Sequence, residues 1–133
     1  IESIYIPLHV VKIGIGAFSS CFKLRSVEFS ENSELKSIDK NAFSYTSIKS
    51  IKLPSNVNQV GEQSFAFCFD LEAVEFLGDN LSIGQFCFKE SKQISVISFP
   101  NCKEITISSN VFPNTFNELK MFINYQAKIH FTS

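Results

Sequence analysis

The stretch GIGAFSSCFKLRSVEF, Gly14 to Phe29, decides the fold because its pattern returns along the whole chain. Its first phenylalanine heads a series with spacings of 25, 22, 23 and 24 residues, formed by Phe18, Phe43, Phe65, Phe88 and Phe112. A β-branched residue stands five positions before each phenylalanine: Ile13, Ile38, Val60, Ile83 and Ile107. The next position holds a turn-former: Gly14, Asp39, Gly61, Gly84 or Ser108. A period of 20 to 50 residues is typical of solenoids and related repeat folds.

Each repeat also contains a strand signal. After the phenylalanine the chain follows the pattern LxxVxF, whose last two apolar positions are two residues apart, as on one face of a strand. The sets are Leu24, Val27 and Phe29; Ile48, Ile51 and Leu53; Leu71, Val74 and Phe76; and Ile94, Ile97 and Phe99. The opening IESIYIP fits the same slots, and prolines follow three of these segments, where a strand would end.

The two glycines of GIGAFSSC also resemble the start of a phosphate-binding loop. Such a loop occurs once and needs a third glycine near position 19, which is Ser19 in this chain. Because the first glycine is a repeat slot, the sequence favours a tight turn in which glycine adopts a positive φ.

The last repeat is irregular. Phe112 predicts inward-facing residues at Met121 and Ile123, but Leu119 stands one place off its slot. The segment YQAKIHFTS, 125–133, has no visible counterpart upstream, so this end reads as a divergent or capping repeat. An additional phenylalanine four residues after the repeat phenylalanine, in alternate repeats, predicts a second apolar strip on the turn side: Phe22, Phe69 and Phe116.

A repeat of about 23 residues cannot bury its apolar side alone, and stacking on its neighbours removes that side from water. The chain is therefore predicted to be a single domain, 1–133, that folds as a parallel β-solenoid. We expect a mostly β structure of the α/β class, with one short strand per repeat and short helical or 3-10 turns on the convex side. The predicted repeats are 1–12 (partial), 13–37, 38–59, 60–82, 83–106 and 107–133.

Charge and hydropathy exclude several classes of partner. The net charge is -1, from twelve basic and thirteen acidic residues that are spread along the chain, so no basic surface for nucleic acid is expected. No apolar run reaches the length of a membrane span, and the first residues lack the plan of a signal peptide. We therefore expect no membrane insertion within this sequence.

The reactive side chains do not form a catalytic or metal-binding pattern. The cysteines Cys21, Cys68, Cys87 and Cys102 include no CxxC, and no histidine stands at metal-ligand spacing. The repeat frame favours four unpaired, mostly buried thiols, with a bridge from Cys68 to Cys87 as the alternative in adjacent coils. His9 and His130 fall in the first and last repeats and cannot form a dyad. We expect no enzyme activity, cofactor or metal.

With its motif written as IGxxAFxxCxxLxxVxFPxxVxxI, the sequence resembles the BspA-like (Treponema-type) leucine-rich repeats over essentially its whole length. This resemblance implies a right-handed, curved leucine-rich repeat solenoid with its strands on the concave side. It also implies a cell-surface or secreted protein of a bacterium or a protozoan. In such proteins these repeats act as adhesins or bind host or matrix proteins, and that function is an analogy with the family.

The outward residues of the strands would form the binding face: Ser3, Tyr5, Ser26, Glu28, Ser50, Lys52, Ala73, Glu75, Val96 and Ser98. Its alternating charges have a structural explanation as well, because neighbouring strands avoid like-charge contacts. Two alternatives stay open: a structural spacer in a larger surface protein, and a weak homodimer through the exposed edge of the first strand. The sequon Asn80-Leu81-Ser82 is a possible glycosylation site, expected in the link after the third repeat strand.

Overall fold

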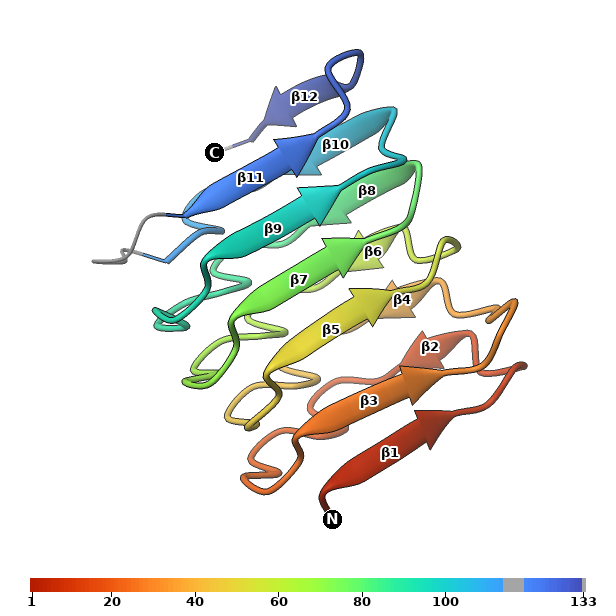
Figure 1. Cartoon of the computed structure of the whole chain (residues 1–133), viewed down its shortest axis with the longest axis vertical. Helices are drawn as coiled ribbons and strands as arrows, with labels where there is room; N and C mark the ends of the chain where they lie inside the picture. Colours follow the sequence, from red (N-terminus) through yellow and green to blue (C-terminus); the bar gives the residue numbers. More distant parts are fainter. Residues whose placement is uncertain (114–118, 133) are drawn as a thin grey trace.

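The chain winds through a stack of turns that each carry one strand at the front and one at the back of Figure 1. We describe it from a computed structural model, which describes residues 1–113 and 119–132. The front strands are β1 (Ser3–Ile6), β3 (Ser26–Phe29), β5 (Ser50–Leu53), β7 (Ala73–Phe76), β9 (Val96–Phe99) and β11 (Lys120–Ile123). The back strands are β2 (Lys12–Ile13), β4 (Ser37–Ile38), β6 (Gln59–Val60), β8 (Asn80–Ile83), β10 (Glu104–Ile107) and β12 (Lys128–Phe131).

All pairings between these strands are parallel, as the repeat pattern predicts. The back strands form one six-stranded sheet, whereas the front strands form a two-stranded sheet, β1-β3, and a four-stranded sheet, β5-β7-β9-β11. In Figure 1 the front strands run from left to right and the back strands return while the chain climbs. The coil is therefore right-handed, and the predicted parallel β-solenoid is confirmed.

The expectation of one strand per repeat is wrong, because each turn contains a second strand at the back. This strand carries the β-branched residue that precedes the turn, and Ile13, Ile38 and Val60 lie in register across β2, β4 and β6. The alternation of a polar and a buried apolar residue, as in Ser37 and Ile38, is a strand pattern only two residues long. It is too short to be recognised by periodicity alone.

The helical or 3-10 turns expected on the convex side are also absent from the described residues, where the turns contain no helix. In the first repeat, the N–H groups of Ala17 and Ser19 donate to the carbonyls of Gly14 and Gly16, three residues earlier. Residues in the left-handed region interrupt this run, at Gly16 with φ 63° and Ser20 with φ 62°. Since a right-handed helix cannot continue through such residues, each turn stays a series of tight bends.

The repeat phenylalanines form a stacked column inside the solenoid. The ring centroids are 5.3 Å apart between Phe18 and Phe43, 5.4 Å between Phe43 and Phe65, and 5.9 Å between Phe65 and Phe88. The rings of Phe43, Phe65 and Phe88 are fully buried. A second stack at the front joins Phe76 to Phe99, with centroids 5.0 Å apart. The predicted spine of phenylalanines is confirmed.

The repeat glycines serve a different purpose from the one expected. Gly14, Gly61 and Gly84 do not have a positive φ, and the glycine that does is Gly16. A Cβ atom on Gly84 would lie 2.6 Å from the backbone nitrogen of Glu62, in the turn of the preceding repeat. Gly61 and Gly84 therefore allow neighbouring turns to approach closely, whereas no atom lies within 4 Å of the Cβ position of Gly14.

The last segment does have a counterpart in the other repeats. Strand β12 pairs with β10, which places Ile129 beside Ile105 and Phe131 beside Ile107. The segment YQAKIHFTS thus contains the back strand of the last turn, Lys128–Phe131, which the sequence pattern does not reveal because it does not identify the other back strands either. In β11, Met121 and Ile123 lie in register with the inward-facing Ile97 and Phe99, although Met121 is 39% exposed. Phe116 lies outside the described residues.

The cysteines are all free thiols, as the repeat frame favours, and three of them are buried. The thiol of Cys87 lies 3.3 Å from the hydroxyl of Ser64, and its burial raises its pKa to about 12. Burial also raises the pKa of Cys68, whose thiol donates to the carbonyl of Phe43 at 3.2 Å. Both groups stay protonated near neutral pH and act as small apolar side chains.

The substitution Phe65→Ala should lower the free energy of unfolding by about 3 to 5 kcal/mol, because it removes a fully buried ring from the centre of the column. The matched control is Phe69→Ala, whose ring is 58% exposed and whose loss should cost about 1 kcal/mol or less. Urea unfolding followed by circular dichroism measures both. Equal midpoints for wild type and Phe65→Ala would contradict the role of the column.

The two glycines Gly84 and Gly14 should respond differently to alanine, although they share one repeat slot. Gly84→Ala forces a backbone shift, since its Cβ would clash with Glu62, and should cost about 1 to 3 kcal/mol. Gly14→Ala meets no neighbour and should leave stability nearly unchanged. Thermal unfolding of the two variants tests this contrast, and comparable losses at both sites would argue against close approach as the cause.

Cys87 should make the protein less stable at alkaline pH. Between the ordinary thiol pKa of 9.0 and the folded value of about 12, the unfolded chain releases a proton that the folded chain retains. Its contribution is therefore intact below pH 9 and declines by about 1.4 kcal/mol per pH unit above it. Cys87→Ala, which places the residue found at Ala17 and Ala42 in this slot, should unfold with a shallower alkaline slope in urea titrations. Parallel slopes for the two proteins would contradict this.

Candidate functional site

The front face, defined as the outward side chains of the front strands, contains the ten residues predicted to bind. Strand register aligns Ser3 with Ser26 and, in the four-stranded sheet, Ser50 with Ala73, Val96 and Lys120. It likewise aligns Tyr5 with Glu28, and Lys52 with Glu75, Ser98 and Phe122. Lys120 and Phe122 were not predicted, although the inward slots of Met121 and Ile123 imply them. The ring of Phe122 is 57% exposed, as is that of Tyr5 at the other end of the front face.

Ion pairs join neighbouring strands on this face. The Lys52 ammonium lies 3.7 Å from the Glu75 carboxylate, and just before the same two strands the Lys49 ammonium lies 3.9 Å from the Glu72 carboxylate. These exposed pairs contribute little to stability, but they neutralise charge along the sheet. Glu28 is different, because no cation among the described residues lies within ion-pair distance of its carboxylate.

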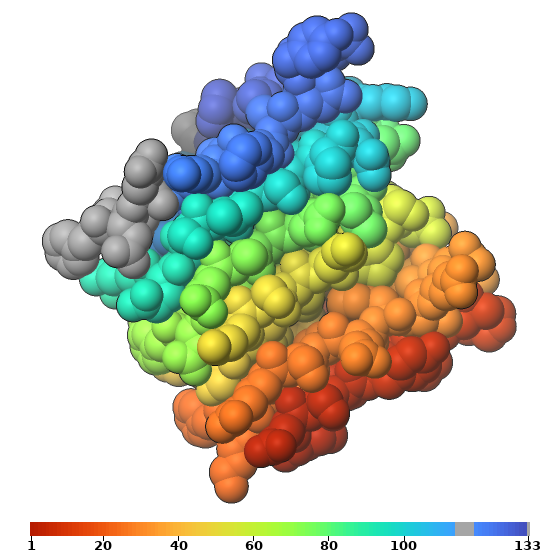
Figure 2. Space-filling view, viewed as in Figure 1, coloured from red at the N-terminus to blue at the C-terminus, as the bar shows by residue number. Residues whose placement is uncertain are grey.

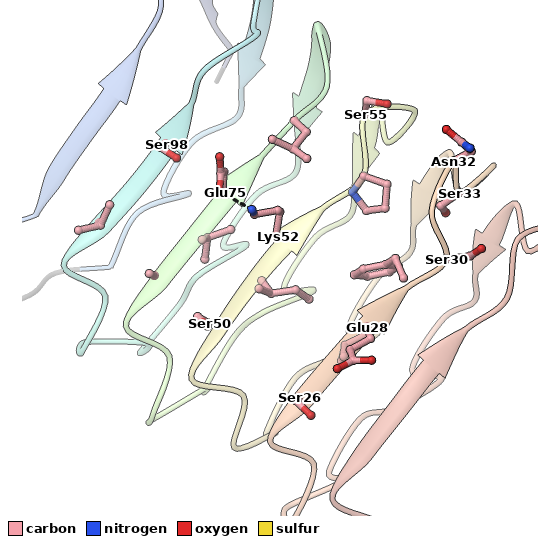
Figure 3. Close-up of a pocket in the computed structure, with 18 residues that line it drawn as sticks. Ser26, Glu28, Ser30, Asn32, Ser33, Ser50, Lys52, Ser55, Glu75 and Ser98 are labelled. Atoms are coloured by element: carbon pink, nitrogen blue, oxygen red, sulfur yellow. Dashed lines mark ion pairs between the residues drawn. The ribbon is translucent and has the colours of Figure 1, made fainter.

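A cleft of about 800 Å³ opens in the middle of the front face. Its lining includes eight of the ten predicted residues, Ser26, Glu28, Ser50, Lys52, Ala73, Glu75, Val96 and Ser98. Ser3 and Tyr5 do not line it, since they lie beyond β3 on β1. Figure 3 shows the labelled side chains that line it on β3, β5, β7 and β9, with the Lys52–Glu75 pair among them. In Figure 2, β3 is orange and β5 is yellow.

The cleft extends from β3 across β5 and β7 to β9, and it includes the place where the front sheet is interrupted. Hydrogen bonds between successive turns recur at one position, from Arg25 N to Glu2 O, Glu72 N to Lys49 O, Ser95 N to Glu72 O, and Lys120 N to Ser95 O. The equivalent bond from Lys49 or Ser50 to the carbonyl of Arg25 is missing, and β3 does not pair with β5. The turns are still joined just before the strands, where Ser47 N donates to Leu24 O at 2.9 Å.

Two sequence features accompany the interruption. Pro54 follows β5 and has no N–H, so it cannot donate to β3 as Leu77 donates to Leu53 at 3.1 Å, but Pro100 has the same place after β9 and leaves β9 paired with β7. The repeat that contains β3 is also the longest, with 25 residues between Phe18 and Phe43, and its extra residues lie in the loop after Phe29. This loop is tied to the next one by Asn56, whose amide donates to the carbonyl of Ser33 at 2.9 Å.

A second surface feature is an aromatic cluster on the turn side. The rings of Tyr45 and Phe67 stack with centroids 4.6 Å apart, and Phe69 lies edge-on to both at 6.4 and 6.3 Å. The Lys89 ammonium lies 5.9 Å from the centroid of Phe67. Phe69 and Phe22 are 58% and 67% exposed, so the predicted second apolar strip does not form a second core.

The remaining candidate residues lie away from the front face. Asn80 is the exposed first residue of β8, in the back sheet rather than in a link. The two histidines are exposed and separate, with His9 3.1 Å from the Glu34 carboxylate and His130 2.7 Å from that of Glu104.

No helix in the described part of the chain has the length and apolar character needed to cross a membrane.

The comparisons with known proteins agree on the repeat. The family model for the BspA type leucine rich repeat region matches residues 1–120 with six copies. No curated protein is similar enough to be a relative.

Three solved structures share the fold. The pneumococcal vaccine antigen PcpA has 23% identity and a TM-score of 0.84, over 94% of this chain and 31% of that one. A leucine-rich repeat protein from Bacteroides ovatus has 28% identity and a TM-score of 0.57, over 80% and 34%. A leucine rich cell surface protein from Faecalibacterium prausnitzii has 15% identity and a TM-score of 0.51, over 100% and 60%.

The chain thus spans about a third of the first two proteins and 60% of the third. One assignment follows from the fold, from the six repeat copies, and from the slots that the repeat phenylalanines and glycines occupy. The chain belongs to the BspA-type leucine-rich repeat family.

Proposed function

We propose that this chain is a protein-recognition or adhesion module of a cell-surface or secreted protein, and that it binds its partner through the front face. The observation that carries the proposal is the cleft, because it coincides with eight of the ten outward residues expected to bind. Rows of serine hydroxyls, two carboxylates and one ammonium group around it offer hydrogen bonds and charge to a polypeptide surface.

The names of the structural neighbours support the location. One is a vaccine antigen and another is a cell surface protein, and both share this fold. The partner we propose is a host or matrix protein, by analogy with the family. If the protein passes through a eukaryotic secretory pathway, a glycan on Asn80 would project from the back sheet and leave the front face open.

The main alternative is a structural spacer that holds other parts of a larger protein at a distance. A spacer would keep the stacked core but would have no use for an open cleft in its front sheet. Self-association through the edge of β1 stays a prediction, which light scattering at high protein concentration tests.

Exchanging charges on the front face should weaken binding to a matrix protein. We expect saturable binding of the immobilised chain to at least one of fibronectin, fibrinogen, laminin and collagen. Lys52→Glu should raise the Kd about ten-fold, since it removes a cation and places three carboxylates side by side. The control is Lys103→Glu, an exposed lysine that does not line the cleft. Surface plasmon resonance measures both. No saturable binding, or an equal effect of the two substitutions, would favour the spacer.

A further inference from the structure

In the described structure, fewer ladder hydrogen bonds join the turns of β3 and β5 than join other successive turns, and we call the boundary between these two strands the junction. A parallel ladder connects β1 with β3, β5 with β7, β7 with β9, and β9 with β11, whereas no ladder connects β3 with β5. The back sheet adds little here, because β2, β4 and β6 pair over two residues each while β8, β10 and β12 pair over four. In Figure 1 the junction lies between the orange β3 and the yellow β5.

The bonds that remain across the junction lie beside the two strands rather than between them. The Ser47 N–H donates to the carbonyl of Leu24 at 2.9 Å, and the side-chain amide of Asn56 donates to the carbonyl of Ser33 at 2.9 Å. These bonds hold β3 close to β5, so the junction is closed in this structure. A single hydrogen bond contributes little net stability, because water competes for both partners, and the missing ladder would have added several such bonds.

Core packing is also thinner on the β3 side of the junction. Phe29, the last residue of β3, is half-buried, whereas the residues in the same slot of the next three front strands, Leu53, Phe76 and Phe99, are fully buried. In a solenoid each turn contacts only its neighbours, so the stability is close to a sum of terms for each turn and for each boundary between turns. A boundary that lacks a ladder and has a half-buried core residue beside it is therefore where the stack should divide most readily.

We propose that residues 1–36, which contain β1, β2 and β3, open as one cooperative unit while the turns beyond the junction stay folded. Because β1 and β3 form a sheet of their own, each is the other's ladder partner, and the two strands should lose their protection together. Opening takes Ser26 and Glu28 away from the other residues that line the cleft, so the cleft is complete only in the closed state. This device belongs to the free chain and does not depend on the proposed function.

Amide hydrogen exchange of the whole chain, measured by NMR at urea concentrations below the unfolding transition, tests this proposal. The amides that donate within the β1–β3 ladder should share one opening equilibrium and exchange at least about ten-fold faster than the ladder amides of β7 and β9. Fraying from the end of the stack would give a different result, with β1 exchanging much faster than β3. Equal protection of all front strands, or protection that falls step by step from β5 through β3 to β1, would overturn the proposal.

Two matched variants show whether the unit opens by itself. Ile13 and Ile83 are buried in the same repeat slot on opposite sides of the junction, and Val60 shows that the slot accepts valine. Ile83→Val should speed exchange in β7 and β9 about five-fold and leave β1 and β3 unchanged, because the region around Ile83 stays folded when the unit opens. Ile13→Val should speed exchange in both regions, since the unit also opens in global unfolding. If Ile83→Val speeds exchange in β1 and β3 as much as in β7 and β9, the chain unfolds as a single unit and the proposal is wrong.

Discussion

Contact between equivalent side chains in successive turns is the constraint on which the rest of the structure depends. The phenylalanine column places each buried ring 5.3 to 5.9 Å from the next, and this spacing requires turns that are nearly identical in path. Gly61 and Gly84 serve the same requirement at the backbone, since a Cβ on either would collide with the turn before it. Outward side chains are therefore held in straight rows, which is how short, separate strands come to form one surface.

The repeat pattern predicted most of this arrangement because its main signals are spacings. The interval between phenylalanines defined the column, and the two-residue spacing of Val27 and Phe29 defined which side chains face inward. Eight predicted face residues consequently line one cleft. The repeat pattern does not reveal β2, β4 and β6, because each contains only two residues. It does not reveal β12 either, because Ile129 and Phe131 match no pattern recognised in the other repeats.

The cleft itself could not be predicted from a single repeat, because it depends on a missing interaction between two of them. One deviation in the sequence lies at this place, the long interval between Phe18 and Phe43. Pro54 is no such deviation, because Pro100 follows β9 in the same way and β9 stays paired with β7. The glycine slot shows the same limit. A recurring glycine in the sequence indicates a position where a side chain is unfavourable. It does not tell whether the cause is a positive φ or the close approach of a neighbouring turn, because both favour glycine.

The sheet can open at the front because the back and the core stay continuous across the same two turns. Register is maintained from β2 through β4 to β6, and the rings of Phe18, Phe43 and Phe65 remain stacked behind the opening. Only hydrogen bonds of the front ladder are given up there, and water or a ligand can replace them. The aromatic cluster on the turn side lacks this property, since Tyr45 and Phe67 cover each other's faces and Lys89 lies over Phe67. A missing ladder and the unpaired carboxylate of Glu28 coincide at the β3–β5 interruption, and this combination distinguishes it from the exposed rings elsewhere.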